Sequence, residues 1–411
     1  MEIVILLIKV FVVFNLIMGL ASVCTWIERK GSALIQDRIG ANRAGAFFRF
    51  PEPVEKMFLT LRVLGGLGIL FSALGAAAAY FSTSVAQTVP PLAFEIGIGV
   101  SALLLVGGLA PLLLRAAGAL GIINTLLCDA VKALLKEDFV PQGTSNFMHC
   151  LAPFMAVFPI FVSFAVLPFA PDFTVGGYDI RPQLATLDAG VLFIFAMGSM
   201  SVYGVALAGW TGNNKFSLLG GLRAAAQMIS YELAMGLSLV SVILMYGTLD
   251  LYEMVQAQSS RWGIVYYPTA FISFLIFFVV GMAETKRGPF DLPESESELV
   301  AGYFTEYSGM KFLLFWLGEF AEIALFSALI TLLFFGGWDI PFVTLPKGVW
   351  WAALIGHAVL VGKILFFCIL QIVIRWTLPR FRYDQLMHLG WKILLPLSMV
   401  NLVIIAATRL L

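Results

Sequence analysis

Long apolar runs, each of about 20 residues, alternate with short polar segments along most of this chain. A helix rises about 1.5 Å per residue, so such a run can cross the roughly 30 Å hydrocarbon core of a bilayer. We therefore expect an all-α polytopic membrane protein with about ten transmembrane helices. The pattern predicts them at residues 3–26, 63–83, 92–114, 147–168, 187–209, 224–249, 264–283, 311–335, 351–375 and 392–410.

Residues 119–138 follow a different pattern. Apolar and polar positions alternate there at helical spacing, and the charged residues fall at one end. This arrangement is typical of an amphipathic helix that lies along a membrane surface. Pro141 follows directly, where it would end such a helix.

Basic residues are distributed unevenly between the two sides that these spans define. One side holds 19 lysines and arginines, and the other holds only Arg181, Arg261, Lys347 and Arg409. The positive-inside rule makes the first side cytoplasmic. The amphipathic helix would then lie on the cytoplasmic surface. With an even number of spans, both termini would face outward.

Composition removes several classes of function. Hydrophobic residues make up 60% of the chain, charged residues make up 12%, and the net charge is zero, so nothing favours binding to nucleic acid. The four cysteines form no C-x-x-C motif, and the three histidines form no H-E-x-x-H motif. We therefore expect no metal site and no iron–sulfur cluster in this chain. No P-loop or dinucleotide-binding glycine pattern is present.

Ionisable residues inside spans are costly and are therefore functional candidates. Glu232 would lie about 12 Å into its span, Glu319 and Glu322 would share a helix face at similar depth, and Lys363 would lie deeper. Glu284 marks the end of the span at 264–283. Buried carboxyl groups can exchange protons near neutral pH, so the row could pass protons laterally. The alternative is a set of Glu–Lys pairs that hold the helices together.

The segment 281–311, between two spans, is unusually rich in carboxyl groups for a chain so low in charge. It carries three bases and six acids, namely Glu284, Asp291, Glu294, Glu296, Glu298 and Glu306. Pro289 and Pro293 indicate an ordered, bent segment rather than a loose loop. The alternative is a solvated docking surface.

Five stretches, in order along the chain, resemble one family. They are ERKGSALIQDRIGANRAG (28–45), DAVKALLKEDFVP (129–141), AGWTGNNKFSLLGGLRAAAQMISYELAMGLSL (208–239), GMAETKRGPFDLPESESELVAGYFTEYSGMK (281–311), and FGGW (335–338) with RWTLPRFRYDQLMHLGWKILLPL (375–397). These motifs resemble the H subunit, the quinone-chamber membrane subunit of proton-pumping NADH:quinone oxidoreductase (respiratory complex I). The resemblance covers nearly the whole chain except residues 46–117.

The resemblance implies a subunit without a redox cofactor of its own. It would form the chamber for quinone, either ubiquinone or menaquinone, and start an acidic path for protons in a bacterial inner membrane. Partner subunits would carry FMN and iron–sulfur clusters or resemble antiporters, and lipids would surround the complex. By matching motif, Glu28, Glu232, Glu284 and Glu319 belong to the proton path, which Glu322 and Lys363 would extend. The loop acids that would couple or dock to the peripheral arm are Asp291, Glu294, Glu296, Glu298 and Glu306. The chamber would include Arg29, Gln36, Arg38, Arg43, Arg287 and Phe290.

One departure from the family pattern concerns the length of the chain. About 70 extra residues, with two of the ten spans, separate Gly45 from the amphipathic segment. We expect a single membrane domain in three parts: residues 1–45, an inserted transmembrane hairpin at 46–117, and the remaining seven spans at 118–411. A hairpin preserves the sidedness of everything that follows it, and we expect it at the periphery.

Two other functions remain open from the sequence. The first is the related membrane subunit of a membrane-bound hydrogenase or formate hydrogenlyase, which uses no quinone. The second is a stand-alone proton-coupled transporter, although the spans show neither the inverted repeat nor the broken helices typical of that class.

Overall fold

The computed structural model describes residues 2–38, 57, 59–61, 63, 122–175, 178–259, 261–266, 269–340 and 348–410. The chain divides into two compact units: residues 1–38 with 130–411, and residues 39–129. The expected hairpin falls in the second unit, and its two spans lie outside the described residues except for Val63. The first unit contains the other described helices, and α4 (Ile122–Leu135) begins in the second unit.

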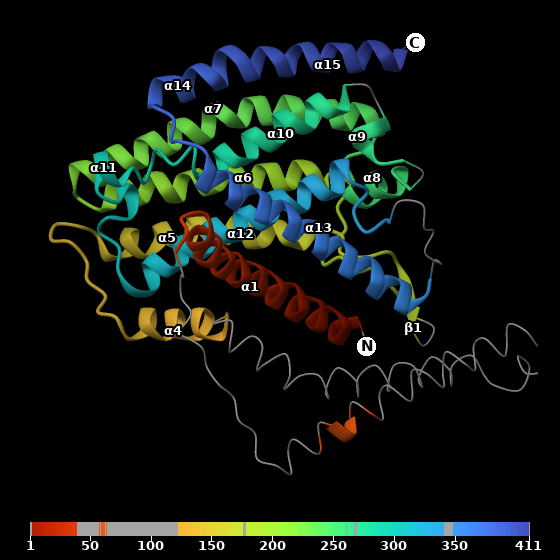
Figure 1. Cartoon of the computed structure of the whole chain (residues 1–411), viewed down its shortest axis with the longest axis horizontal. Coiled ribbons are helices and arrows are strands. Elements are labelled where there is room, and N and C mark those ends of the chain that lie inside the picture. The colour runs from red at the N-terminus through yellow and green to blue at the C-terminus, as the bar shows by residue number, and fades with distance from the viewer. Residues whose placement is uncertain are drawn as a thin grey trace, which may run out of the picture. The chain divides into compact units, whose positions relative to one another are not determined.

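Seven helices in the described part are long and apolar enough to cross a membrane. They are α1 (Glu2–Ile35), α5 (Asn146–Ser163) with η1 (Phe164–Val166), α6 (Gly190–Thr211), α7 (Lys215–Tyr246), α12 (Gly309–Phe334), α13 (Trp350–Thr377), and the continuous run of α14 (Tyr383–His388), a π-helical turn η3 (Leu389–Leu394) and α15 (Leu395–Leu410). A shorter apolar helix, α10 (Ala270–Glu284), takes the place of the span expected at 264–283. Figure 1 shows these helices running roughly alongside one another. The all-α polytopic class is therefore confirmed.

Several boundaries differ from those expected. α1 continues past residue 26 to Ile35, so Glu28 lies on a helix rather than in a loop. α7 begins at Lys215 instead of 224, because Asn214 caps it by accepting a hydrogen bond from the backbone N–H of Phe216. Glu232 therefore lies about 26 Å along its helix, not 12 Å. The expected amphipathic segment does form a helix, α4.

Short elements connect the spans. β1 (Phe173–Val175) pairs antiparallel with β2 (Tyr178–Ile180), with Phe173 opposite Ile180. α8 (Leu251–Ala257) and α9 (Gly263–Tyr266) lie between α7 and α10. The segment between α10 and α12 contains α11 (Glu296–Leu299) and the 3-10 turn η2 (Gly302–Phe304).

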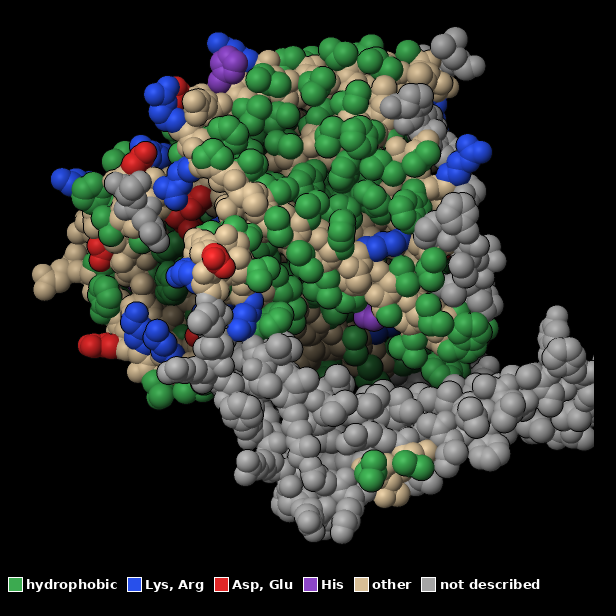
Figure 2. All heavy atoms as spheres, viewed as in Figure 1, with side chains coloured by type: hydrophobic (Ala, Val, Ile, Leu, Met, Phe, Trp, Pro, Cys, Tyr) green, Lys and Arg blue, Asp and Glu red, His purple; other side chains and the backbone are tan. Residues whose placement is uncertain are grey.

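α12 is the central helix of the first unit. Every residue from Gly318 to Phe334 is buried, and α12 packs against α1, α5, α10 and α13. Glycines allow close approach elsewhere: a Cβ at Gly209 on α6 would lie only 2.9 Å from the Cα of Gly221 on α7. Figure 2 shows hydrophobic side chains over much of the outer face, with charged side chains gathered toward one end. Such a surface is expected of a protein surrounded by lipid.

Candidate functional site

The segment 285–308, which we call the acidic loop, folds against the ends of several helices. It follows α10 and leads into α12, and its side chains reach α1, α7, α12 and the chain just after α13. The ordered, bent conformation expected from Pro289 and Pro293 is what the structure shows, since Phe290 and Leu292 are both buried.

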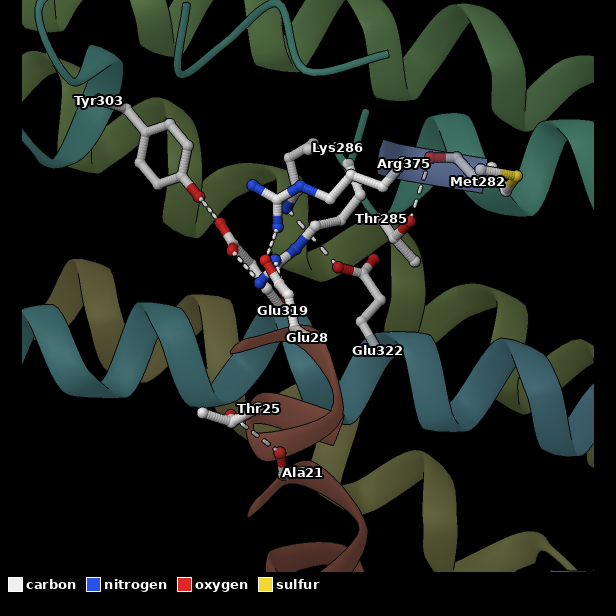
Figure 3. Close-up of polar contacts among 11 residues, drawn as sticks. Ala21, Thr25, Glu28, Met282, Thr285, Lys286, Tyr303, Glu319, Glu322 and Arg375 are labelled. Atoms are coloured by element: carbon white, nitrogen blue, oxygen red, sulfur yellow. Dashed lines mark hydrogen bonds and ion pairs between the residues drawn. The ribbon is translucent and has the colours of Figure 1, made fainter. Parts of the chain in front are cut away.

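Arg287 lies at the centre of a buried ion-pair network (Figure 3). Its Nη1 lies 2.8 Å from Oε2 of Glu28 on α1, and its Nη2 lies 3.1 Å from Oε2 of Glu319 on α12. Arg375, near the end of α13, donates to the other oxygen of Glu28. The guanidinium of Arg287 also covers the ring of Phe320, 4.3 Å from its centroid. Burial alone would lower the pKa of Arg287, but the carboxylates of Glu28 and Glu319 outweigh it, and the pKa is raised.

Lys286 extends the network to the next acid on α12. Its Nζ lies 3.7 Å from Oε2 of Glu322, and both side chains are buried. Glu319 and Glu322 are three residues apart on one face of the helix, and the consecutive bases Lys286 and Arg287 each face one of them. Lys286 has a left-handed backbone (φ 55°), which turns the chain sharply at the end of α10. The shared face expected for the two glutamates is therefore where the bases bind.

Glu319 has a further partner from the acidic loop. The hydroxyl of Tyr303 donates to Oε1 of Glu319 over 2.9 Å (Figure 3). Glu294 of the same loop is influenced by Glu319: burial raises the pKa of Glu294 well above its usual range, and the negative charges of Glu319 and Asp291 raise it further.

A second set of bonds fixes the rest of the acidic loop. The side chain of the buried Gln227, on α7, donates to the backbone carbonyls of Ala283 (2.7 Å) and Phe290 (2.9 Å). Arg380, which follows α13, donates to Asp291 (3.0 Å) and to Ser295 (3.1 Å). Burial raises the pKa of Asp291, although Arg380 and Arg375 oppose the shift.

Aromatic rings complete this packing. The ring of Phe290 stacks on Phe381 with centroids 5.4 Å apart, and it meets the edge of Tyr231 at 5.9 Å. Tyr231 in turn donates its hydroxyl to the carbonyl of Leu386, on α14. Phe290, expected to line a chamber, is thus a buried anchor of the loop.

Three carboxyl groups from different helices line one cavity of about 40 Å³. Glu232 on α7, Glu284 at the end of α10 and Glu322 on α12 share it with Ser163, Ser199 and apolar side chains. A water molecule needs roughly 10–15 Å³ of such space and at least two polar partners, so the cavity suits water. Oε2 of Glu284 has no hydrogen-bond partner within the described residues, whereas Glu232 accepts a hydrogen bond from Ser199.

The remaining residues predicted for the site lie outside this network. Glu298 pairs with Arg223 of α7 (2.7 Å) and is half exposed, and Glu306 accepts a hydrogen bond from Asn214 (2.8 Å). Arg29 is exposed near the ring of Trp316, and Arg38 donates to Gln36, both exposed. Arg43 and the side chain of Glu296 fall outside the described residues.

Lys363 is separated from the carboxylates. Its ammonium binds the backbone carbonyls of Phe335, Gly337 and Asp339, beyond the other end of α12. Five other side chains belong to the network, although the sequence did not assign them to the site: Gln227, Lys286, Tyr303, Arg375 and Arg380. Lys286 and Tyr303 lie in the charged segment 281–311, so the composition of that segment could have suggested them as site residues. Nothing in the pattern distinguishes Gln227 from other polar residues of a span.

The balance of charge in this region determines its chemistry. The network and the adjoining cavity contain the carboxyl groups of Glu28, Glu232, Glu284, Asp291, Glu294, Glu319 and Glu322, and the bases Lys286, Arg287, Arg375 and Arg380. Seven acids therefore face four bases where burial disfavours unpaired charge.

The fold and the site define a polytopic helical membrane protein with a network of acidic and basic side chains beneath an ordered acidic loop. The family model described as "NADH dehydrogenase" matches residues 114–406. One of the H subunits of NADH-quinone oxidoreductase from Geobacter metallireducens is 49% identical over 287 residues, which cover 70% of this chain and 83% of the relative. The corresponding H subunit from Protochlamydia amoebophila is 47% identical over 284 residues, covering 68% and 82%. The chain therefore belongs to the H-subunit family of NADH-quinone oxidoreductase.

A third relative bears on the inserted segment. An H subunit of NADH-quinone oxidoreductase from Cytophaga hutchinsonii is 37% identical over 401 residues, which cover 97% of this chain and 95% of the relative. This alignment, which covers nearly the whole chain, therefore extends across residues 46–117. The insertion is thus shared with at least one other member of the family.

Proposed function

We propose that this chain forms the quinone-binding chamber of a proton-translocating NADH:quinone oxidoreductase and begins the carboxylate path that couples quinone reduction to proton pumping. Family membership supports the assignment to the complex. The observation that carries the finer proposal is the contact of Glu319 with Arg287 and Tyr303, which links the acidic loop to the helix that carries Glu322.

The proposed path has three segments. In the first, a proton passes between Glu294 and Glu319 at the base of the acidic loop. In the second, the proton moves along α12 to Glu322, which lies one turn further on the same face. In the third, water in the 40 Å³ cavity connects Glu322 with Glu284 and Glu232. Glu28 sets the charge at the start of the path, because it holds Arg287 against Glu319.

Quinone reduction would drive this path electrostatically. Reduction takes two electrons and two protons, so negative charge develops on the headgroup before it is protonated. A negative charge about 8 Å from a carboxyl group costs about 2 kcal/mol at an effective dielectric constant of about 20. That energy changes the proton affinity roughly thirtyfold. A group such as Glu294, whose pKa burial already raises, would then take up a proton.

The other roles follow from the positions of the residues. Arg29, Gln36, Arg38 and Arg43 would line or hold the entrance of the chamber, and Arg287 and Phe290 would fix its loop. The partly exposed Glu298 and Glu306, with Glu296, would face the peripheral arm. FMN and iron–sulfur clusters would lie in partner subunits, beside small membrane subunits and antiporter-like subunits. The complex would lie in a bacterial inner membrane with both termini of this chain on the outer side and the hairpin at the periphery.

A pull-down of the tagged chain from gently solubilised membranes tests this proposal. We expect co-purification with flavin-, cluster- and antiporter-type subunits and inhibitor-sensitive reduction of quinone by NADH. Recovery with nickel–iron hydrogenase subunits would place the chain in the hydrogenase branch, and recovery alone would favour a transporter.

The path itself is tested by the variant E319Q in that complex. E319Q should lower coupled quinone reduction, while E253Q should not, because Glu253 is an exposed residue of α8 bonded to Thr248. Wild-type rates and proton pumping in E319Q would disprove the path.

A further inference from the structure

The chain that leaves α12 folds into a small cage of backbone carbonyls. The carbonyl oxygens of Phe335, Gly337 and Asp339 lie 2.8, 2.9 and 2.7 Å from Nζ of Lys363. Gly336 and Gly337 both have left-handed backbones, with φ of 68° and 54°, which brings the alternate carbonyls to one point. A Cβ at Gly336 would lie 2.9 Å from Trp262, and one at Gly337 would lie 2.9 Å from Val255.

Lys363 uses all its hydrogen-bonding capacity in this cage. An ammonium group has three N–H donors and no acceptor, and each donor meets one of the three carbonyls. The negative end of the α12 dipole also favours a cation at this position. The ring of Trp262 lies 5.1 Å from the same nitrogen. A neutral amine would have only two N–H groups for the three carbonyls, so the site requires the charged form.

Other side chains bind the same end of α12. Gln258 donates to the carbonyl of Leu332 (2.7 Å) and accepts from the backbone N–H of Gly336 (2.9 Å). The hydroxyl of Tyr246 donates to the carbonyl of Leu333 (3.0 Å). Because α12 is buried throughout its second half, neither lipid nor bulk water can satisfy these carbonyls. Side chains from three other elements therefore complete the helix end.

We propose that Lys363 is a positioning residue: its ammonium fills a cation-specific carbonyl cage and fixes the end of the helix that carries Glu319 and Glu322. Lys363 then carries no proton during turnover, in contrast to the role that its intramembrane position suggests. The cage can be tested without assuming the proposed function. Only the link to proton pumping rests on it.

The stability test uses the purified complex and its midpoint of heat dissociation, followed by size-exclusion chromatography. K363A and K363M should each lower the midpoint by roughly 5 °C. K9M is the matched control, because Lys9 is also an intramembrane lysine but donates to a single carbonyl, that of Gln183. K9M should leave the midpoint nearly unchanged.

Chemical rescue tests the requirement for a hydrogen-bonding cation. Propylammonium restores the atoms that K363A removes, so it should raise the midpoint of K363A but not that of K363M, whose side chain blocks the space. Tetramethylammonium has the same charge but no N–H donor and should not rescue. Absence of rescue by propylammonium, or equal rescue by tetramethylammonium, would overturn the cage.

K363R separates positioning from proton transfer, because arginine stays charged at all working pH values. We expect K363R to keep the wild-type number of protons pumped per quinone and the wild-type pH profile. A K363R complex of normal stability that reduces quinone without pumping would show that Lys363 carries protons. If E319Q behaves as wild type while the rescue succeeds, the proposed path fails and the cage stands.

Discussion

Arg287 and Glu28 form a buried ion pair of 2.8 Å across 259 positions of the sequence. The same guanidinium reaches Glu319, so a single side chain of the acidic loop joins the first span to the central one. Removal of one member of a buried pair leaves an uncompensated charge, which typically costs about 3–5 kcal/mol. The loop and the two helices are therefore expected to behave as one unit.

The first prediction concerns the charge of Arg287. R287M should strongly lower the yield and the thermal stability of the complex, because two carboxylates lose their shared partner. R287M combined with E28Q and E319Q should recover part of the loss, since the stranded charges are then removed. The measurement is the amount of assembled complex on a native gel and its dissociation midpoint. A triple variant less stable than R287M alone would contradict this account.

The second prediction is a pH dependence that comes from Glu294. Burial raises its pKa in the folded protein above its value in the unfolded chain, so the folded state binds more protons between the two values. Glu294 therefore contributes fully to the free energy of unfolding below the ordinary carboxyl pKa of about 4.3. This contribution is lost as the pH rises through the raised pKa of Glu294 in the folded protein. The docked loop should therefore loosen as the pH rises, which hydrogen exchange of residues 285–308 can measure.

E294Q isolates that contribution, because the amide mimics the protonated carboxyl group. Hydrogen exchange of the loop, corrected for its intrinsic dependence on pH, should become less sensitive to pH in E294Q. E298Q is the matched control, since Glu298 belongs to the same loop but is half exposed and paired with Arg223. An equal change in both variants would assign the effect to the general charge of the loop.

The third prediction tests the cavity between Glu232, Glu284 and Glu322. A Cβ at Gly198 would meet no atom within 4 Å, so G198A should be tolerated, while G198L should fill the cavity and exclude water. We expect G198L to lower proton pumping at least tenfold with assembly intact. G362L is the control, because Gly362 also faces open space but lies on α13, away from the cavity. Normal pumping in G198L would show that no water passes there.

The fourth prediction concerns Gln227, which holds the loop by two backbone carbonyls. Q227L should leave the carbonyls of Ala283 and Phe290 without their donor, at a cost of about 1–3 kcal/mol for each buried group. Proteolysis between residues 285 and 308 should accelerate in Q227L. It should stay at the wild-type rate in Q256L, because Gln256 is exposed on α8. Equal rates of proteolysis in Q227L and Q256L would show that Gln227 does not hold the loop in place.

Much of the fold follows from the sequence because the bilayer imposes simple constraints. A segment in hydrocarbon must satisfy its own backbone hydrogen bonds, so apolar runs of about 20 residues predict helices reliably. Eight of the ten expected spans coincide with described helices, and the other two lie outside the described residues. Boundaries were less accurate, because α1 and α7 continue beyond the apolar runs into segments that carry charged residues.

The sequence predicted which residues belong to the site, but not which of them contact one another. The charged segment, the paired glutamates of α12 and the importance of Glu28 and Arg287 could be recognised from residue types and family motifs. The pairing of Arg287 with Glu28 could not, because sequence spacing does not show which helices lie side by side. The same applies to Lys363. Its position within a span suggested a place beside the carboxylates, but its ammonium contacts backbone carbonyls beyond the other end of α12.

The sequence by itself thus determined that this protein crosses the membrane many times, belongs to one family and carries a loop rich in carboxyl groups. Hydrophobic length and local motifs are sufficient for that, since they depend on neighbours along the chain. Only the tertiary structure decided which acid meets which base, which three carboxyl groups share a cavity, and which lysine faces a carbonyl cage instead. Those choices depend on packing between helices that are distant in sequence, where a rotation or a shift of one turn changes every partner.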